Sequence, residues 1–156
     1  MESKEIFNKL NFHIKTFQEG FSILLSSRNK KEIEANYCKI LKGSLLVEKV
    51  KLFYYTDLVK WQQVLPKSEI QNDIAFPISE EIKLHENFPS EKSYSAVVPY
   101  QTNEAYSIVV SEKLSGEDFN DEDIFNLNLF AQLLLEGYRS FNRMMLEKEL
   151  NFSLKN

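Results

Sequence analysis

The chain has 156 residues, of which 43% are hydrophobic and 27% charged, with only four glycines and four prolines. This length and composition suit one compact domain and exclude collagen-like, linker-like and disordered chains. The formal net charge is −4, and no run of basic residues exceeds two, which argues against a nucleic acid partner.

The single cysteine, Cys38, cannot form an internal disulfide and cannot build a thiolate metal site alone. No apolar stretch approaches the roughly 18 to 20 residues that cross a bilayer, and the first five residues do not resemble a secretory leader. We therefore expect a cytoplasmic location and no membrane partner.

Two amphipathic helices are predicted at the start of the chain. Between Glu5 and Ser27, apolar residues recur at spacings of three, four and seven, which is the period of one helical face. A second helix is predicted from Lys30 to Lys42, with Gly43 as its C-terminal stop. The predicted fold therefore opens with a helical hairpin.

A change of period to two then predicts a pair of strands. Residues 47–55 alternate between two faces and are rich in β-branched and aromatic side chains. A second strand is predicted over 58–65, with Trp61 and Leu65 on the same face, and Pro66 ends it because proline has no N–H to donate.

The middle of the chain is less regular. Residues 73–78 are expected to form a short edge strand and residues 79–84 a brief helix capped by Ser79. Two further strands are predicted over 94–100 and 105–112, joined by a four-residue hairpin loop.

A long final helix is predicted from Asp121 to about Ser153. Asn120 suits its N-cap, and three acidic residues follow in the first turn, where they complement the helix dipole. Apolar residues then advance by alternating threes and fours, as in a heptad seam. Such a helix is roughly 50 Å long, so its last turns should project from the domain and meet a partner. The positions that we expect at a homodimer interface are Leu134, Tyr138, Phe141 and Met145.

The motifs of the common enzyme classes are absent from the sequence. The four glycines are too far apart for a phosphate-binding loop, and no serine has the glycine neighbours of a nucleophile elbow. The scattered Cys38, His13 and His85 do not have metal-ligand spacing. We therefore expect no catalytic activity and no metal site, and the sequence leaves any other cofactor unknown.

The order of these elements, together with three local motifs, resembles the GAF domain, a sensory module of bacterial signalling proteins. The motifs are Ala96-Val97-Val98-Pro99, the strand Tyr106-Ser107-Ile108-Val109-Val110, and the final helix start Phe119-Asn120-Asp121-Glu122-Asp123-Ile124-Phe125 leading to Phe130-Ala131-Gln132-Leu133. A PAS-like or profilin-like fold is the structural alternative, but PAS modules normally begin their core with strands.

The resemblance implies an α+β fold. A central antiparallel sheet of five to six strands would have the N-terminal helices and the long C-terminal helix on one face, and the irregular middle segment would close a pocket on the other. It also implies a single domain over residues 1–145, with 146–156 beginning a signalling helix or linker toward an output domain. Bilin attachment is not expected, because Cys38 lies in the second helix.

The function implied by the resemblance is regulatory: a small molecule or a change in dimer packing would be relayed through the terminal helices. A ligand-free dimerisation or docking module is the alternative. Residues chosen for their strand faces as candidate ligand contacts are Phe53, Trp61, Phe76, His85, Tyr94 and Val98.

Overall fold

The computed structural model describes residues 30–68 and 74–155. The helix predicted over residues 5–27 lies outside these ranges. The described elements, in chain order, are α2 (Lys30–Leu45), β1 (Val47–Thr56), β2 (Lys60–Leu65), β3 (Lys83–Glu86), β4 (Ser93–Pro99), β5 (Ala105–Lys113) and α3 (Asp121–Lys155).

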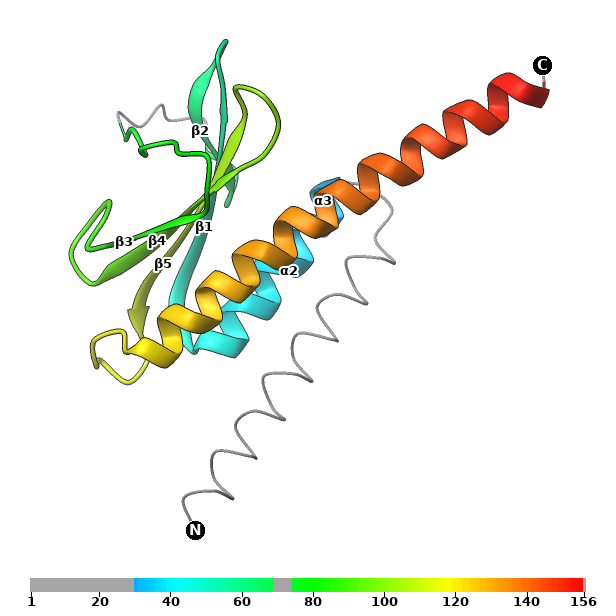
Figure 1. The fold of residues 1–156 in the computed structure, drawn as a ribbon. Helices are drawn as coiled ribbons and strands as arrows, with labels where there is room; N and C mark the ends of the chain where they lie inside the picture. The colour runs from blue at the N-terminus through cyan, green and yellow to red at the C-terminus, as the bar shows by residue number, and fades with distance from the viewer. Residues whose placement is uncertain (1–29, 69–73, 156) are drawn as a thin grey trace.

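The five strands form one antiparallel sheet in the order β2-β1-β5-β4-β3. Both α2 and α3 lie on the same side of this sheet (Figure 1). The α+β architecture predicted from the sequence is therefore confirmed. We call the side that carries the helices the helix face, and the opposite side the cover face.

The main core lies between the helix face and the two helices. Alternate residues of the central strands enter it, among them Leu52 of β1 and Ile108 of β5, both fully buried. The helices contribute residues at helical spacing, such as Leu41 of α2 and Leu134 of α3. A second, smaller core on the cover face is described below.

The long helix α3 is buried over its first half only. Its 35 residues give a length of about 50 Å, and no residue after Tyr138 is fully buried within the described part of the helix. The C-terminal half extends beyond the sheet (Figure 1). Its exposed apolar residues are Met145, Leu146 and Leu150.

The start of α3 agrees with the sequence prediction. The Asn120 side chain accepts a hydrogen bond from the Asp123 amide at 2.9 Å, and the Asp123 carboxylate accepts one from the Asn120 amide at 3.0 Å. This reciprocal arrangement is a capping box. Lys113, the last residue of β5, also pairs with Asp123 at 2.8 Å, which ties the helix start to the sheet.

The middle of the chain differs from the prediction. Of the edge strand predicted over 73–78, the described residues 74–78 form no strand; residues 79–84 form no helix, and the third strand begins at Lys83. Ile82 and Leu84 both pack against the main core. Two residues that lie two positions apart can share a face in extended chain but not in a helix, and this packing favours the strand.

A bulge in β2 corrects a second detail. Phe53 pairs with Gln63 but its neighbour Leu52 pairs with Leu65, so Val64 is an extra residue in β2. The extra residue reverses the alternation of faces. Leu65 therefore packs against the main core, whereas Trp61 lies on the cover face.

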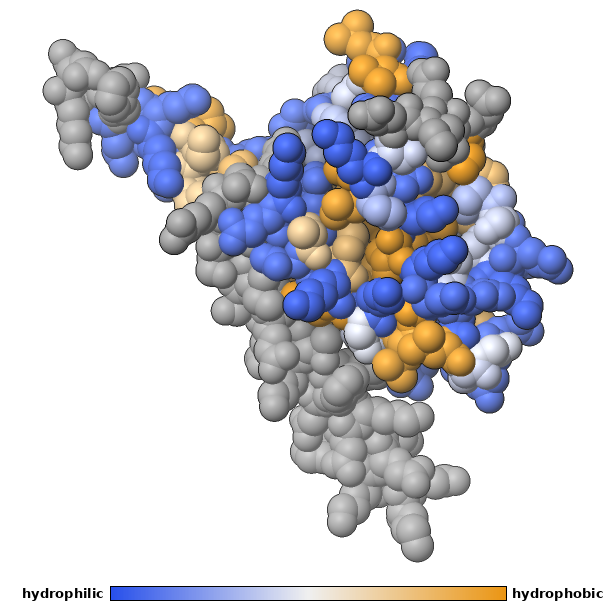
Figure 2. Space-filling model, turned by 180° about the vertical axis from the view of Figure 1, so that it is seen from behind, coloured by the Kyte–Doolittle hydropathy of each residue, from blue (hydrophilic) through white to orange (hydrophobic). Residues whose placement is uncertain are grey.

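Hydrophilic side chains dominate the surface seen from behind, and apolar side chains are exposed between them in the middle of the domain (Figure 2). Within the described residues, no helix has an apolar stretch long enough to traverse a bilayer.

Candidate functional site

Aromatic side chains cover the second face of the sheet. Phe53 of β1 and Trp61 of β2 both contact Phe76, which belongs to the segment between β2 and β3, with ring centroids 5.1 Å and 4.9 Å from it. The Trp61 indole N–H also donates a hydrogen bond to the Phe76 carbonyl oxygen at 3.2 Å. The ring and the backbone of Phe76 are therefore both in contact with the sheet.

The aromatic layer continues toward the far edge of the sheet. The Phe76 ring meets Phe88 at 5.3 Å, and Phe88 lies 6.3 Å from the imidazole of His85, on the edge strand β3. Rings from four separate parts of the chain therefore form one apolar surface, and His85 contributes its polar end.

Three buried polar atoms on this face have no hydrogen-bond partner within the described structure: His85 Nε2, Ser95 Oγ and Ser107 Oγ. The two serines are fully buried. His85 lies directly opposite Ser95 in the β3–β4 ladder, and Ser107 lies opposite Val97, two residues along β4. Directly opposite and diagonal neighbours on one face are about 5 to 8 Å apart. Ser95 therefore lies between His85 and Ser107, and the three residues form a row of polar side chains across β3, β4 and β5 on the cover face.

An unpaired buried hydroxyl costs free energy, since folding removes its water without replacing the hydrogen bond. Buried polar groups without partners are rare in folded proteins, and each one calls for a partner such as a bound water, an ion or a ligand. Hydroxyls can donate and accept, and an imidazole nitrogen does one or the other according to its tautomer. The arrangement can hold a flat molecule with several polar atoms on one edge.

Four of the six residues proposed as ligand contacts lie on this face, namely Phe53, Trp61, Phe76 and His85. The remaining two belong to the helix face. Val98 is part of the main core, and Tyr94 packs against it, with its ring 5.9 Å from Phe119. The prediction that Tyr94 and Val98 join the other four is therefore wrong.

The serines were missed by sequence reasoning, although their signal was present. Alternation along β4 places Tyr94, Ala96 and Val98 on one face and Ser93, Ser95 and Val97 on the other. The first set has the larger aromatic side chain, and it was assigned to the pocket. The helices cover that set instead, so the smaller, more polar set faces the aromatic layer.

The helix face carries a cluster of tyrosines that links the sheet to α3. The rings of Tyr106 and Tyr138 stack at 4.5 Å with an interplanar angle of 12°, and Tyr54 stacks on the other side of Tyr106 at 4.7 Å. The Tyr138 hydroxyl donates a hydrogen bond to the buried Glu34 carboxylate of α2 at 2.8 Å. This cluster joins β1, β5, α2 and α3.

The cluster also decides which predicted dimer contacts are available. Leu134 and Tyr138 are fully buried in the core of their own chain, so they cannot meet a second copy, and this part of the prediction is wrong. Phe141 packs partly against the core. Met145 is 42% exposed and remains available.

Burial dominates the acid–base properties of the helix face. Desolvation raises the pKa of Tyr138 well above its ordinary value, and the nearby Tyr106 and Glu34 raise it further. Desolvation likewise raises the pKa of Tyr106. The pKa of the Cys38 thiol is raised to about 12, first by burial and then by the Glu34 charge. These groups are held in their neutral forms at physiological pH.

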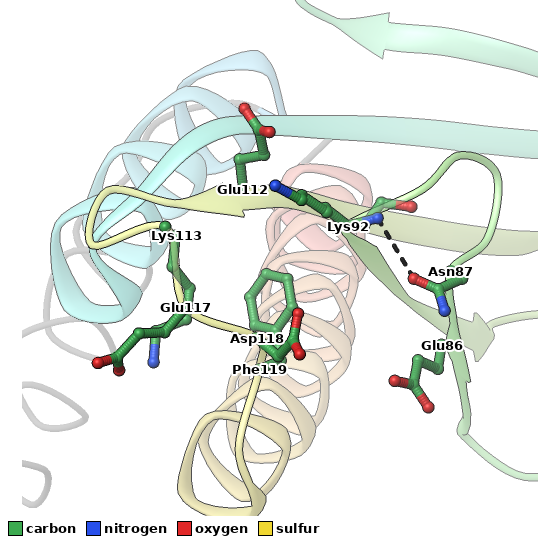
Figure 3. A pocket seen from close by; sticks show the side chains of 10 residues that line it. Glu86, Asn87, Lys92, Glu112, Lys113, Glu117, Asp118 and Phe119 are labelled. Atoms are coloured by element: carbon green, nitrogen blue, oxygen red, sulfur yellow. Dashed lines mark hydrogen bonds between the residues drawn. The ribbon is translucent and has the colours of Figure 1, made fainter.

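A small polar cavity at the end of the sheet is a weaker candidate (Figure 3). It lies between the β3–β4 turn, the end of β5 and the loop before α3, and the Lys92 amide donates across the turn to the Asn87 side chain at 3.3 Å. Its volume is about 30 Å³, which suits one or two water molecules. Within the described ranges, no group of three or more His, Cys, Asp or Glu side chains could hold a metal ion.

Comparison with known proteins places the fold. No protein-family model and no curated protein matches the sequence. The structure is similar to the crystal structure of the GAF domain of a protein assigned as a sensor histidine kinase in Pseudomonas syringae pv. tomato. The TM-score is 0.66 at 13% sequence identity, over 96% of this chain and 98% of that one. The chain therefore has a GAF-like fold over nearly its whole length.

Proposed function

We propose that this chain is a regulatory sensory domain that binds a small molecule on the cover face and relays its presence through α3. The observation that carries the proposal is the group of three unpartnered polar atoms, His85 Nε2, Ser95 Oγ and Ser107 Oγ, beneath the aromatic layer. The GAF-like fold supports it, since the similar structure is a GAF domain from a protein assigned as a sensor kinase.

The ligand proposed is a flat molecule with hydrogen-bonding groups along one edge. Its edge would meet the imidazole and the two hydroxyls, and its faces would contact aromatic rings such as Phe76 and Phe88. Because Phe76 and Phe88 contact each other now, the ligand enters by displacing the segment that carries Phe76. The domain itself needs no catalytic group for this role, and any catalysis would belong to a separate output domain.

The proposed ligand site and α3 are connected through two adjacent residues of β5. Ser107 and Tyr106 are neighbours on β5 and point to opposite faces, and the Tyr106 ring stacks on Tyr138 of α3. A ligand that shifts β5 would change this stack and so the position of α3. Such a ligand biases α3 only if it binds one arrangement more tightly than the other.

We propose that α3 pairs with α3 of a second copy of the chain, so that a change in the position of α3 changes the dimer. Met145, Leu146 and Leu150 remain exposed on the part of α3 that extends beyond the sheet, and apolar residues at such spacing favour helix pairing. Leu146→Glu combined with Leu150→Glu should abolish a dimer in sedimentation velocity. Glu147→Gln, on the same stretch of helix, is the control and should leave the dimer unchanged.

Native mass spectrometry of the purified protein tests the ligand directly, because a tightly bound small molecule adds its mass to the chain. A panel of nucleobases, cyclic nucleotides and indoles should then be screened by melting temperature and by fluorescence of Trp61, the only tryptophan. A molecule that binds should bind about tenfold more weakly to the Ser107→Ala variant, because this substitution removes one hydrogen bond between uncharged groups. Ser140→Ala on α3 is the matched control. A hit whose affinity is equal in both variants would place the ligand elsewhere.

A ligand-free dimerisation or docking module is the second candidate. The observation in its favour is that Phe76 contacts Phe53, Trp61 and Phe88 directly, so side chains already fill the aromatic layer. This candidate predicts that Leu146→Glu combined with Leu150→Glu abolishes dimerisation or docking. It also predicts that no molecule in the panel changes the melting temperature of the protein.

A further inference from the structure

One edge of β1 is open over half its length. The β1–β2 ladder runs only from Leu52 to Thr56, because Pro66 follows Leu65 and has no N–H with which to extend it. The earlier part of β1, residues 48–51, pairs with β5 on its other side. On the β2 side, residues 48–51 have no strand partner among the described residues. Backbone groups of alternate residues point to this side.

A groove of about 550 Å³ runs along this open edge. One wall is α2, which contributes Ala35 and Cys38, and the end of β2 contributes Leu65, followed by Pro66. Val50 faces the same side as the core residue Leu52, and Cys38, Val50 and Leu65 all pack against the main core. The groove therefore has an apolar floor and an unpaired strand edge along one side.

The rim of the groove is positively charged. Four lysines line it, and Glu48 is the one carboxylate among the described lining residues. The lysines are Lys39 and Lys42 on α2 and Lys49 and Lys51 on β1. No ion pair joins any of them to another side chain within the described residues. Lysines on an open edge discourage pairing with neutral strands and favour a partner of opposite charge.

We propose that this groove binds an extended peptide of a partner protein, in which acidic and apolar residues alternate, and that the peptide adds to β1 as a further strand. Alternation follows from the geometry of the edge. An added strand presents every second side chain to each face of the sheet. One set would meet Val50 and the apolar floor, and the other would meet Lys49 and Lys51, which have the opposite parity to Val50.

A second copy of the chain is a poorer occupant. Antiparallel pairing of two β1 edges centred on Val50 would place Lys49 of one copy opposite Lys51 of the other. Like charges directly opposite in a ladder destabilise it. An acidic peptide replaces this repulsion by attraction, and main-chain hydrogen bonds supply affinity of their own. None of the described residues that line the groove belongs to the aromatic layer, so the inference does not depend on the proposed ligand.

Fluorescence anisotropy with a fluorescein-labelled peptide of four Glu-Val repeats tests the proposal. The peptide should bind the full chain saturably, and the matching Lys-Val peptide should not bind. Lys49→Glu with Lys51→Glu should weaken binding about tenfold, in line with the loss of two exposed ion pairs. Lys83→Glu with Lys148→Glu makes the same change of charge away from the groove, since Lys83 is on β3 at the opposite edge of the sheet and Lys148 is on the exposed end of α3, and should alter binding less than about twofold. Far-UV circular dichroism verifies that both variants are folded.

Backbone N-methylation of the valines in the peptide separates strand addition from charge attraction. The methylated peptide keeps every charge but loses main-chain donors, so it should bind at least about tenfold more weakly. Amides of residues 48–51 should also exchange more slowly with deuterium when the unmethylated peptide is present. Equal affinity for the two peptides would overturn the proposal. It would also be overturned if sedimentation showed a dimer of the free chain and deuterium exchange showed that the amides of residues 48–51 are already protected in it.

Discussion

Replacing Ser107 by alanine should stabilise the protein. Most buried substitutions destabilise, so the opposite sign is a sharp test of the unpartnered hydroxyl. Ser107 has no exposure to solvent. The residues directly opposite it in the two neighbouring strands are Val97 of β4 and Phe53 of β1. Neither side chain can accept or donate a hydrogen bond.

The magnitude follows from two opposing effects. A buried hydroxyl without a partner costs about 1 to 3 kcal/mol in desolvation. Removing one oxygen atom leaves a void of roughly 10 Å³, which costs about 0.3 kcal/mol. Ser107→Ala should therefore raise the free energy of unfolding by about 1 kcal/mol or more. For a chain of 156 residues this corresponds to a rise in melting temperature of about 2 to 4 °C.

Urea unfolding followed by Trp61 fluorescence measures the change. The midpoint should rise while the slope of free energy against urea stays the same, since the exposed surface is unchanged. Ser93→Ala is the matched control, because Ser93 is also a buried serine of the sheet but its hydroxyl donates to the Ser90 carbonyl and accepts from the Ser90 amide. This variant should lose about 1 kcal/mol.

A loss of 1 kcal/mol or more in Ser107→Ala would show that the hydroxyl already has a partner in the free protein. The hydroxyl would then not be free to bind a ligand, and the main support for a ligand on the cover face would be removed. Ser95→Ala provides an independent repeat, because Ser95 is equally buried and lies on the neighbouring strand.

Three further outcomes are expected from urea unfolding of variants or at different pH. Tyr138→Phe should cost about 2 kcal/mol, since its hydroxyl donates to the buried Glu34 carboxylate; no measurable loss would show that this bond does not contribute. Folding raises the pKa of Cys38 to about 12, so the unfolded chain loses this proton first and stability should fall from about pH 9 upward, by up to 1.4 kcal/mol per pH unit. In Cys38→Ala the fall should begin only near pH 10, with the tyrosines, and an unchanged profile would contradict the assignment. Asn120→Ala should cost about 1 kcal/mol by removing the cap of α3, whereas Asn120→Asp should cost little, and equal losses would argue against the cap.

The periodicity of the chain was enough to predict most of the elements. Alternation over residues 47–55 and 105–112, the Asn120 cap and the long apolar seam of the final helix all depend on local chemistry, which does not require knowledge of the partners in space. The third strand was misplaced, because four residues at a sheet edge have almost no periodic signal of their own. The domain boundary near 145 stays a prediction, since α3 passes that position without a break.

The heptad seam shows a limit of the same reasoning. Its spacing is the same whether the apolar face meets another chain or the chain's own sheet. Leu134 and Tyr138 pack inside the protomer because α3 crosses the sheet beside α2, and Met145 stays exposed because α3 extends past it.

By itself, the sequence determined which residues share a face of each strand, because side chains alternate with a strict period of two. It could not determine which of the two faces meets the helices, because both faces of β4 and β5 are apolar enough to be buried. Only the tertiary packing of α2 and α3 decided that, and it placed Tyr94 and Val98 under the helices and Ser95 and Ser107 under the aromatic layer.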